Sequence, residues 1–414
     1  MQADTNTIDT TTFKEEITNL EQAKKTFSEA LNVASLDATV ISPGRINIIG
    51  EHTDYNGGLS LPSSISKGIY FGFKKLPEAQ EGDPEIHLDL TSYQFKSQLK
   101  ITKLEKREAK EESWANYLIG VASKLKEDYG LDSIRLRCIF GGNLPMGYGV
   151  SSSAALCCGF AAGVAALYGL ELEKLTLAKI AQYSEINFAG VNCGLLDQTA
   201  IFFGSKNTAV RIDFKDNSLQ KIDFSESNFS VILADSGEKR ELAGSEYNKR
   251  RATCEAALEK LKAKFGEEND NFRDYTLEEI NQAKEDGILT ELEHRRASFV
   301  GEESKRVDSM VEALKENNEE KMGELLNGSH TGLSELYEVT TERLDQLVEL
   351  ANAAEGCIGS RMMGGGFGGC TVNLVRKGSE DAFVNHLKAE FKALYEEDLR
   401  VLTTEVGDGV TVHQ

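Results

Sequence analysis

The sequence lacks the features of several protein classes. None of its seven cysteines stands in a Cys-x-x-Cys pair and their number is odd, so we expect neither a disulfide framework nor a zinc site. Cysteines in apolar or glycine-rich surroundings are usually buried small hydrophobic residues. Free thiols are typical of a reducing compartment, and we therefore predict a cytoplasmic protein.

Secretion and membrane signals are missing as well. Residues 1–20 are polar and mixed in charge, with neither the basic nor the apolar region of a signal peptide. The longest apolar stretch, residues 154–170, is at the short limit of the roughly 17–25 residues that span a bilayer. We expect a buried helix there and no membrane partner.

Positive charge is scarce, because 46 Lys and Arg residues stand against 67 Asp and Glu residues, a net charge of −21. An acidic chain repels phosphodiester backbones, which argues against a nucleic-acid partner. Any phosphate site must therefore be built locally, against the overall field. With 40% hydrophobic and 27% charged residues the composition is that of a globular protein, and 414 residues suggest about two or three domains.

Strands and helices follow one another in an uneven order without internal repeats, which indicates an α+β fold and not regular β–α–β winding. We expect strands at residues 38–41, 59–74, 86–90, 95–101, 134–140, 208–214, 229–234, 370–375 and 401–406. We expect helices at residues 13–31, 114–128, 154–170, 175–188 and 246–265, then helical segments to residue 354 and one more helix after residue 375. Residues 43–45 suggest a turn, residues 270–286 an acidic surface excursion, and a domain boundary is placed near residue 225.

A glycine-rich loop at residues 141–155 joins a predicted strand to a predicted helix. Gly147 and Gly149 let the backbone approach a ligand closely, and the free N–H groups of the helix start favour phosphate. Three serines at 151–153 add hydroxyl donors and a candidate Mg²⁺ ligand. The loop is neither a Walker A loop nor a Gly-x-Gly-x-x-Gly fingerprint. A serine-capped buried helix after a tight turn would explain the same pattern.

Residues 44–58 place charged, amide and hydroxyl side chains around tight turns. Such a segment is costly to bury, so we expect it to line a cleft. Carboxylates and a histidine suit sugar hydroxyls, which both donate and accept hydrogen bonds. Taken singly, Glu51 and Asp54 would more often be solvated and His52 structural.

Asp197 follows a predicted helix that carries Glu185 and lies in an apolar, glycine-flanked turn at residues 190–198. A carboxylate in such surroundings is a candidate for a functional residue. A helix N-cap or a turn aspartate would fit the spacing equally well.

Two other parts of the chain carry weaker signals. Residues 360–370 contain five glycines around Phe367, which a tight connection between strands would also explain. Trp114 and Tyr247, taken alone, would more often be core residues.

Together these segments resemble the galactokinase family of GHMP kinases, in order from about residue 38 to about residue 376. Residues 44–58 match the signature Gly-Arg-x-Asn-x-Ile-Gly-Glu-His-x-Asp-Tyr-Asn-x-Gly at every fixed position. Residues 145–154 resemble the family's ATP loop, Pro-x-Gly-x-Gly-x-Ser-Ser-Ser-Ala, and residues 194–198 its Gly-Ile-Met-Asp-Gln motif, with two leucines in place of Ile-Met. Residues 114–117, 242–251 and 360–370 are similar to further family segments.

The resemblance implies the two-domain GHMP kinase fold. Residues 1–225 would form an N-terminal domain like domain 2 of ribosomal protein S5, and residues 226–414 a ferredoxin-like C-terminal domain, with the site in the cleft. It also implies that the chain phosphorylates galactose at its C1 hydroxyl with ATP and Mg²⁺, the first committed step of galactose catabolism. Galactose and ATP are the expected partners, and a monomer the expected state.

The same resemblance implies the roles of individual residues. Asp197 would accept or orient the proton of the attacking hydroxyl, and Arg45 would hold that carboxylate ionised and stabilise charge on the moving phosphoryl group. The expected sugar site comprises Arg45, Glu51, His52, Asp54, Gly194, Asp197 and Tyr247. The expected ATP site comprises Trp114, Pro145, Gly147, Tyr148, Gly149, Val150, Ser151, Ser152, Ser153 and Ala154. Mg²⁺ is expected on Glu185 with Ser152 or Ser153.

One departure from the family pattern is Phe299, which stands where many relatives have histidine; we interpret it as a packing change outside the site. His330 also matches a family pattern, and we expect it to be structural. Another sugar kinase of the family, acting on N-acetylgalactosamine, arabinose or galacturonate, stays open as an alternative. A sugar- and ATP-binding regulator without turnover is disfavoured by Ser153-Ala154 and Asp197, and a mevalonate-type or homoserine kinase by residues 51–55.

Overall fold

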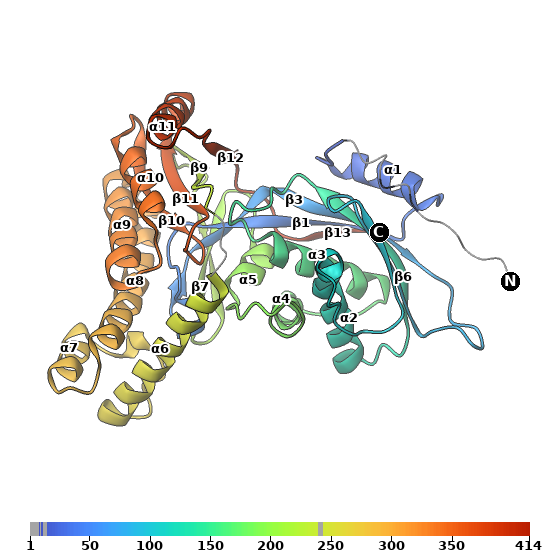
Figure 1. Cartoon of the computed structure of the whole chain (residues 1–414), viewed down its shortest axis with the longest axis horizontal. Helices are drawn as coiled ribbons and strands as arrows, with labels where there is room; N and C mark the ends of the chain where they lie inside the picture. Colours follow the sequence, from blue (N-terminus) through green and yellow to red (C-terminus); the bar gives the residue numbers. More distant parts are fainter. Residues whose placement is uncertain (1–7, 9, 11–14, 239–242) are drawn as a thin grey trace.

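The computed structural model describes residue 8, residue 10, residues 15–238 and residues 243–414. A six-stranded sheet in the order β13-β1-β3-β6-β4-β5 forms its first layer (Figure 1). Its strands are β1 (Ala38–Asn47), β3 (Pro62–Lys75), β4 (Ile86–Ser92), β5 (Ser97–Ile101), β6 (Ile134–Gly142) and β13 (Thr411–His413). Neighbouring strands are antiparallel except for β4 and β6, which are parallel.

Helices cover both faces of this sheet. On one face lie α2 (Asn116–Tyr129), α3 (Ser152–Leu167), α4 (Lys174–Ser184) and α5 (Leu196–Phe203), and on the other lies α1 (Leu20–Leu31) (Figure 1). Successive side chains of a strand point to opposite faces, so Tyr70 packs with α1 while Phe71 and Phe73 meet α3. A Cβ at Gly159 or Gly163 would lie within 2.2 Å of those phenylalanine rings, and α3 therefore needs glycine to approach the sheet so closely.

A second, four-stranded antiparallel sheet has the order β10-β11-β9-β12. Its strands are β9 (Phe229–Asp235), β10 (Cys357–Met363), β11 (Cys370–Arg376) and β12 (Arg400–Thr404). Helices α10 (Glu342–Ala353) and α11 (Glu380–Tyr395) pack on it around Leu347 and Phe383. Helix α9 (Glu319–Thr331) also packs against β10, while α6 (Ala243–Phe265), α7 (Leu277–Glu285) and α8 (Glu291–Lys315) extend beyond this layer (Figure 1).

A three-stranded sheet and several short helical segments complete the fold. The three-stranded sheet comprises β2 (Leu59–Ser60), β7 (Thr208–Asp213) and β8 (Ser218–Asp223). The 3-10 segments are η2 (Asp54–Asn56), η3 (Lys110–Ala115) and η5 (Phe272–Asp274), and the π-helical turns are η4 (Glu185–Ala189) and η6 (Gly332–Leu336).

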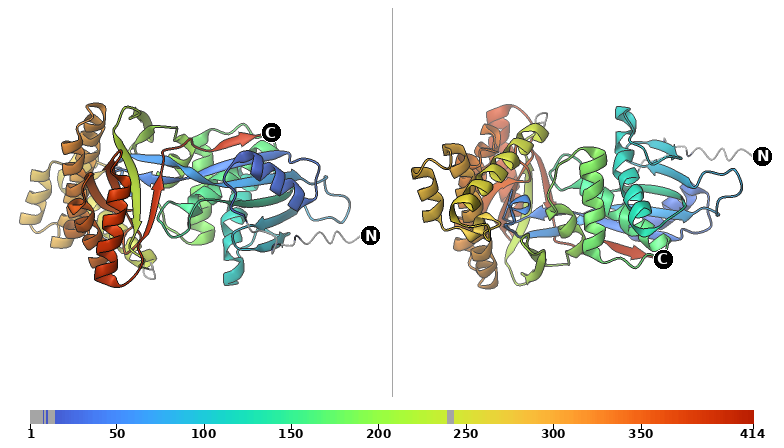
Figure 2. Two further views of the ribbon diagram at one scale, coloured as in Figure 1. Left: turned by 90° about the horizontal axis from the view of Figure 1, so that it is seen from above. Right: turned by 90° about the horizontal axis from the view of Figure 1, so that it is seen from below.

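The C-terminal end of the chain returns to the first sheet. Strand β13 pairs with β1, and Val406 forms a bridge with Ile65. Figure 2 shows this last segment lying beside the N-terminal sheet. The division predicted near residue 225 falls between β8 and β9, and as an exact domain boundary it stays a prediction.

The predicted α+β class and most predicted elements are confirmed. Residues 43–45, however, are not a turn: they lie within β1, where the register against β3 shifts between Pro43 and Arg45. Gly44 is needed for close packing, since a Cβ there would lie 2.4 Å from Leu144 and 2.8 Å from the carbonyl oxygen of Val150. The apolar stretch is a buried helix, α3, and within the described residues no helix is long and apolar enough to cross a membrane.

Several boundaries differ from those predicted. The first helix starts at Leu20, with Asn19 as its N-cap, and Phe13 lies outside the described residues. Helix α4 ends at Ser184 and passes into η4, so the predicted helix 175–188 contains a π-helical turn. The excursion at 270–286 contains η5 and α7. Strands β8, β10 and β13 were not predicted, because β8 is largely exposed and polar, β10 runs into the glycine-rich segment and β13 has three residues.

Candidate active site

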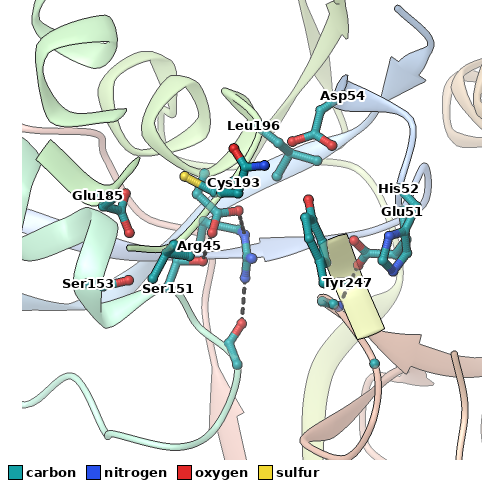
Figure 3. Close-up of a pocket in the computed structure, with 18 of the residues that line it drawn as sticks. Arg45, Glu51, His52, Asp54, Ser151, Ser153, Glu185, Cys193, Leu196 and Tyr247 are labelled. Atoms are coloured by element: carbon teal, nitrogen blue, oxygen red, sulfur yellow. Dashed lines mark hydrogen bonds and ion pairs between the residues drawn. The ribbon is translucent and has the colours of Figure 1, made fainter. Parts of the chain in front are cut away.

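A cavity of about 360 Å³ lies between the first sheet, the start of α5 and the C-terminal glycines 364–366. We call it the sugar-side cavity. Its lining contains the predicted residues Arg45, Glu51, His52, Asp54, Gly149, Ser151, Ser153, Glu185, Gly194, Asp197 and Tyr247. Figure 3 shows Arg45 in the middle, with Glu185 and Ser153 toward one end and His52 and Tyr247 toward the other.

Asp197, in the first turn of α5, is held by two side chains at the centre of the cavity. Its Oδ1 accepts a hydrogen bond from Arg45 Nε at 2.7 Å, and its Oδ2 accepts one from the Ser151 hydroxyl. Arg45 Nη1 also donates to the Gly149 carbonyl at 2.5 Å. The side chain of Arg45 is 6% exposed and that of Asp197 28%, so the carboxylate is the part of the pair that remains accessible. Charge-assisted hydrogen bonds of this kind fix both position and orientation.

The glycine-rich loop reaches Asp197 through an unusual backbone conformation. Gly147 and Gly149 have φ values of 87° and 68°, and Ser151 has φ 57°, the left-handed region that non-glycine residues rarely occupy. Ser151 immediately precedes α3, and its side chain bonds Asp197 instead of capping the helix. The predicted alternative of a serine-capped helix is therefore wrong for Ser151. Backbone strain of this kind is often found at functional sites.

Glu51 joins residues 44–58, which we call the sugar signature, to the C-terminal domain. Its Oε1 accepts hydrogen bonds from both terminal nitrogens of Arg361, each at 3.3 Å, and from the Gly364 N–H at 2.8 Å. Arg361 is completely buried and also donates to the backbone oxygens of Asn47 and Ile48, at 2.6 and 2.8 Å. A buried ion pair is tolerated only when both charged groups have further hydrogen-bond partners of this kind.

Asp54 and Gly194 lie side by side in the lining of the sugar-side cavity. Burial raises the pKa of Asp54 to about 6, and the negative charge of Asp197 adds to this shift. A Cβ at Gly194 would lie 1.8 Å from Oδ2 of Asp54, so only glycine leaves room for this carboxylate.

His52 is neutral and backed by two tyrosines. Burial lowers its pKa to about 3, and its Nδ1 lies 2.7 Å from the hydroxyl of Tyr55, which lies 2.9 Å from that of Tyr337. Phe299 packs on the Tyr337 ring with centroids 4.7 Å apart and lines neither cavity of the site. It is thus a packing residue, as predicted, but one that touches the hydrogen-bonded chain behind His52.

Tyr247 comes from α6 and closes the cavity opposite the signature. Its ring centroid lies 5.4 Å from that of His52 and 5.3 Å from that of Tyr55. Of the family-like segment 242–251, Leu242 lies outside the described residues.

Glu185, at the start of η4, is buried at the other end of the cavity. Burial raises its pKa to about 7, although hydrogen bonds with Ser153 and Gln198 oppose this shift. A carboxylate and a serine hydroxyl are hard oxygen donors, and Mg²⁺ is commonly held by one or two carboxylates together with substrate phosphates. The residues present therefore fit the predicted ion, although the described part of the chain contains no group of three or more His, Cys, Asp or Glu residues that could hold a metal alone.

A second cavity, of about 450 Å³, lies on the other side of the glycine-rich loop. We call it the loop-side cavity. It is lined by Gly147, Gly149, Val150, Ser151, Ser152, Ser153, Asp235, Gly237, Glu238 and Arg400. Trp114, Pro145, Tyr148 and Ala154 line neither cavity, and Trp114 is buried between Phe95 and Phe140. Contacts of these four residues with a nucleotide stay a prediction.

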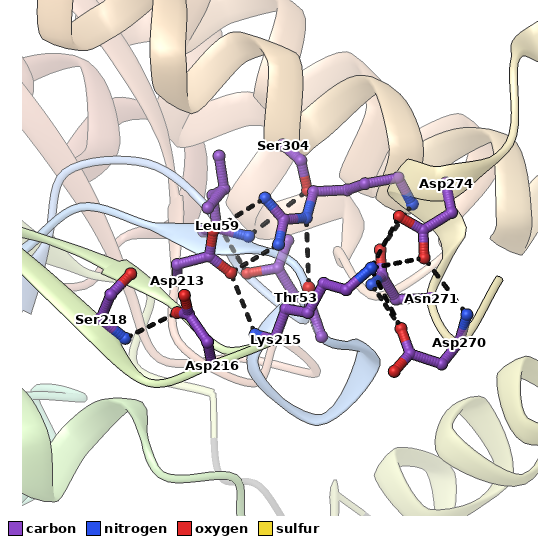
Figure 4. A network of polar contacts seen from close by, with 12 residues as sticks. Thr53, Leu59, Asp213, Lys215, Asp216, Ser218, Asp270, Asn271, Asp274 and Ser304 are labelled. Carbon is purple, nitrogen blue, oxygen red and sulfur yellow. Dashed lines mark hydrogen bonds and ion pairs between the residues drawn. The ribbon is translucent and has the colours of Figure 1, made fainter. Parts of the chain in front are cut away.

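A polar network holds the turn of the sugar signature from outside (Figure 4). Arg273 of η5 donates to both carboxylate oxygens of Asp213, at 2.5 and 3.1 Å, and its Nε donates to the Gly57 carbonyl at 3.2 Å. Nearby, Lys215 contacts Asp274 at 2.9 Å and Asp270 at 3.3 Å. This network joins the β7–β8 hairpin and the turn at η2 to the C-terminal domain.

Comparison with known proteins agrees with this geometry. Three family models match: the galactokinase galactose-binding signature at residues 25–75, the GHMP kinases N terminal domain at 116–205 and the GHMP kinases C terminal at 310–393. Galactokinase of Halalkalibacterium halodurans is 35% identical over 397 residues, 95% of this chain and 98% of that protein. Galactokinase of Thermotoga petrophila is 37% identical over 372 residues, 90% of this chain and 99% of that protein.

The chain belongs to the galactokinase family. The crystal structure of Lactococcus lactis galactokinase complexed with galactose matches with a TM-score of 0.85 and 30% identity, covering 94% of this chain and 99% of that one. Mevalonate kinase of Methanococcus jannaschii matches with a TM-score of 0.62 at 18% identity, which supports the shared fold alone. The predicted two-domain GHMP kinase fold and the resemblance to galactokinases are confirmed.

Some lining residues of this galactokinase were not in the predicted site. Residues 360–370 resemble a family segment, but the expected sugar site did not include the glycines 364–366, which line the sugar-side cavity. The predicted site contains neither Arg361, which lies in the family-like segment 360–370, nor Arg400, because their partners lie far away along the chain.

Proposed function

We propose that this galactokinase transfers the γ-phosphoryl group of ATP to the C1 hydroxyl of α-D-galactose, giving galactose 1-phosphate and ADP. The observation that carries the proposal is the position of Asp197. Its carboxylate is oriented by Arg45 and Ser151 and opens into a cavity otherwise lined by sugar-compatible polar groups. The Lactococcus lactis relative, described as complexed with galactose, supports this choice of sugar.

Asp197 keeps acceptor capacity for a substrate. A carboxylate offers about four lone-pair sites, and Arg45 and Ser151 each occupy one of them. A sugar hydroxyl in the cavity can therefore donate to Asp197, which orients it for attack and accepts its proton as the bond to phosphorus forms. Phosphoryl transfer depends mainly on positioning and electrostatic stabilisation, and Arg45 supplies a buried positive charge beside the reacting groups.

The other end of the cavity is suited to orient the sugar ring. Glu51 has its Oε1 occupied by Arg361 and Gly364, which leaves Oε2 as an acceptor. Asp54 and His52 add further donors and acceptors, and the half-buried Tyr247 covers them. Sugar hydroxyls need both donors and acceptors at fixed positions.

The glycine-rich loop lies between the two cavities, with Gly149, Ser151 and Ser153 lining both. ATP phosphates would be bound by its N–H groups and by the start of α3. Glu185 with Ser152 or Ser153 would hold Mg²⁺, which neutralises phosphate charge when bound. We also propose that the protein works as a monomer in the cytoplasm, a compartment in which its seven free cysteines would stay reduced.

The proposal is tested by measuring ATP consumption with Mg²⁺ on a panel of galactose, N-acetylgalactosamine, arabinose, galacturonate, glucose and mevalonate. We expect strong turnover on galactose, with the product shown by phosphorus NMR to carry its phosphate on C1. Turnover on another sugar of the panel would replace galactose as the substrate. Galactose binding without turnover on any compound would contradict the proposed activity.

A further inference from the structure

The loop-side cavity has one cationic residue in its lining. Among the described residues that line it, Arg400 is the only Lys or Arg, while Asp235 and Glu238 bring negative charge. The chain as a whole carries a net charge of −21. A phosphate group entering this cavity would therefore be repelled by its surroundings unless a cation compensates.

Arg400 reaches the glycine-rich loop from the C-terminal domain. It is the first residue of β12 and stands directly opposite Asp235 of β9, to whose carboxylate it donates a hydrogen bond. Its guanidinium carbon lies 5.1 Å from the centre of the Tyr148 ring. A Cβ placed on Gly147 would be 4.0 Å from Nη2 of Arg400. Arg400 thus lies over the turn of the loop.

The side chain of Arg400 is 56% exposed, whereas that of Asp235 is 2% exposed. A guanidinium has five N–H donors in a planar fork. The hydrogen bond with Asp235 uses Nη2, so other donors of Arg400 remain for a ligand. The same fork matches the geometry of phosphate oxygens.

We propose that Arg400 binds a phosphate group of the nucleotide, from the domain opposite the glycine-rich loop. The inference rests on the proposed function, in which ATP is the phosphoryl donor. Arg45 lines the sugar-side cavity and Arg400 the loop-side cavity, and loop residues line both. The two arginines therefore place positive charge on both sides of the loop in an otherwise acidic protein. Asp235 pairs with the guanidinium, and the other N–H donors of Arg400 bind the phosphate when the nucleotide enters.

Nucleotide affinity in the absence of sugar tests the inference. ATP and ADP are titrated with Mg²⁺ into the wild-type protein and into Arg400→Ala by calorimetry. We expect the variant to bind ATP about tenfold or more weakly, since a charge-assisted hydrogen bond to the phosphate is lost. The slope of log Kd against log salt concentration should also become smaller, because one phosphate contact is lost. An unchanged ATP affinity would overturn the inference.

Two further variants separate binding from structure. In Asp235→Asn the β9–β12 charge pair is lost while Arg400 keeps its charge, so ATP should bind at least as tightly as in the wild type. If Asp235→Asn and Arg400→Ala weakened ATP binding alike, the pair would have a structural role only and the inference would be wrong. Arg376→Ala is the matched control, because Arg376 ends strand β11 of the same sheet and is an exposed arginine paired with Glu319. It should bind ATP as the wild type does.

The same experiment distinguishes the inference from the proposed function. A wild-type protein that binds ATP, with Arg400→Ala binding equally well, contradicts the role of Arg400 alone. A wild-type protein that does not bind ATP contradicts the proposed function itself. Thermal unfolding of each variant confirms that a lost affinity is measured on folded protein.

Discussion

Glu51 and Arg361, which are 310 positions apart, form a buried ion pair that joins the sugar signature to the second sheet. The Glu51 oxygen in this pair also accepts a hydrogen bond from Gly364, whose neighbours Gly365 and Gly366 line the sugar-side cavity with it. The position of the C-terminal glycines and that of a carboxylate of the proposed sugar site are therefore coupled.

Arg361→Met should destabilise the protein strongly. Removing one partner of a buried pair typically costs about 3–5 kcal/mol, because the other charge is left uncompensated. We expect this loss in the free energy of unfolding in urea. The double variant Glu51→Gln with Arg361→Met should recover part of the loss, since no unpaired charge remains. Unchanged stability in Arg361→Met would contradict the coupling.

Asp197→Asn should abolish turnover while galactose still binds. The amide keeps the size of the carboxylate but cannot accept a proton, and general-base catalysis contributes about 10²–10⁴-fold. The kcat for galactose should fall by a factor in that range, and the galactose Kd from calorimetry should stay within about threefold. Near-full activity of the variant would remove Asp197 from the proposed role.

Gly194→Ala should weaken galactose binding more than ATP binding. The added Cβ would lie 1.8 Å from Asp54 Oδ2, so the carboxylate has to move. The KM for galactose should rise about tenfold or more, as expected when a substrate hydrogen bond is lost. Gly301→Ala in α8 is the control, because a Cβ there meets only the Phe272 carbonyl oxygen, at 3.7 Å. An unchanged galactose KM in Gly194→Ala would show that the Asp54 carboxylate does not contact the sugar.

Much of this site could be predicted from the sequence because its polar residues lie in short local segments that resemble galactokinase motifs. Taken alone, Asp197 and the loop serines would fit a helix cap as well, and the resemblance implied their roles. The structure brings Asp197, Arg45, Ser151 and Ser153 together in one cavity. The partners that arrive from the C-terminal domain could not be predicted. Arg361 and Arg400 are arginines at strand positions, and nothing local indicates that one is buried and the other lies over the loop.

The mistaken turn at residues 43–45 has a similar cause. Proline followed by glycine favours a turn when only local preferences are considered. In the structure Gly44 is required by the close approach of Val150, and Arg45 N–H donates to the Val150 carbonyl at 3.1 Å. Tertiary packing against the glycine-rich loop therefore determines the conformation of this segment, and pairing with β3 keeps it extended.

The raised pKa of Asp54 predicts how stability depends on pH. Burial, with the charge of Asp197, raises this pKa from 3.8 to about 6. Between these values the folded protein keeps a proton that the unfolded chain releases, so this group's contribution to stability is lost as pH rises toward 6. His52 acts in the opposite direction, because burial lowers its pKa from 6.5 to about 3. The wild type must therefore be compared with Asp54→Asn at each pH.

Asp54→Asn should become more stable relative to the wild type as pH rises from about 4 to 6, by about 2 kcal/mol. The measurement is the free energy of urea unfolding without sugar. Asp216→Asn should show a difference of the opposite sign, since hydrogen bonds from Ser218 lower the pKa of Asp216. A pH-independent difference for Asp54→Asn would contradict the predicted shift.

Arg273→Met should loosen the turn that carries Asp54. The side chains of Arg273 and Asp213 are only 21% and 17% exposed, and the pair is bidentate, so its loss should cost about 1–3 kcal/mol of stability. Because Arg273 also binds the Gly57 carbonyl next to η2, the galactose KM should rise severalfold while kcat changes little. Lys215→Met is the matched control in the same network (Figure 4), since the 41% exposed Lys215 forms surface pairs worth about 0–1 kcal/mol. Equal effects of the two substitutions on galactose KM would show that Arg273 supports the fold without positioning the sugar signature.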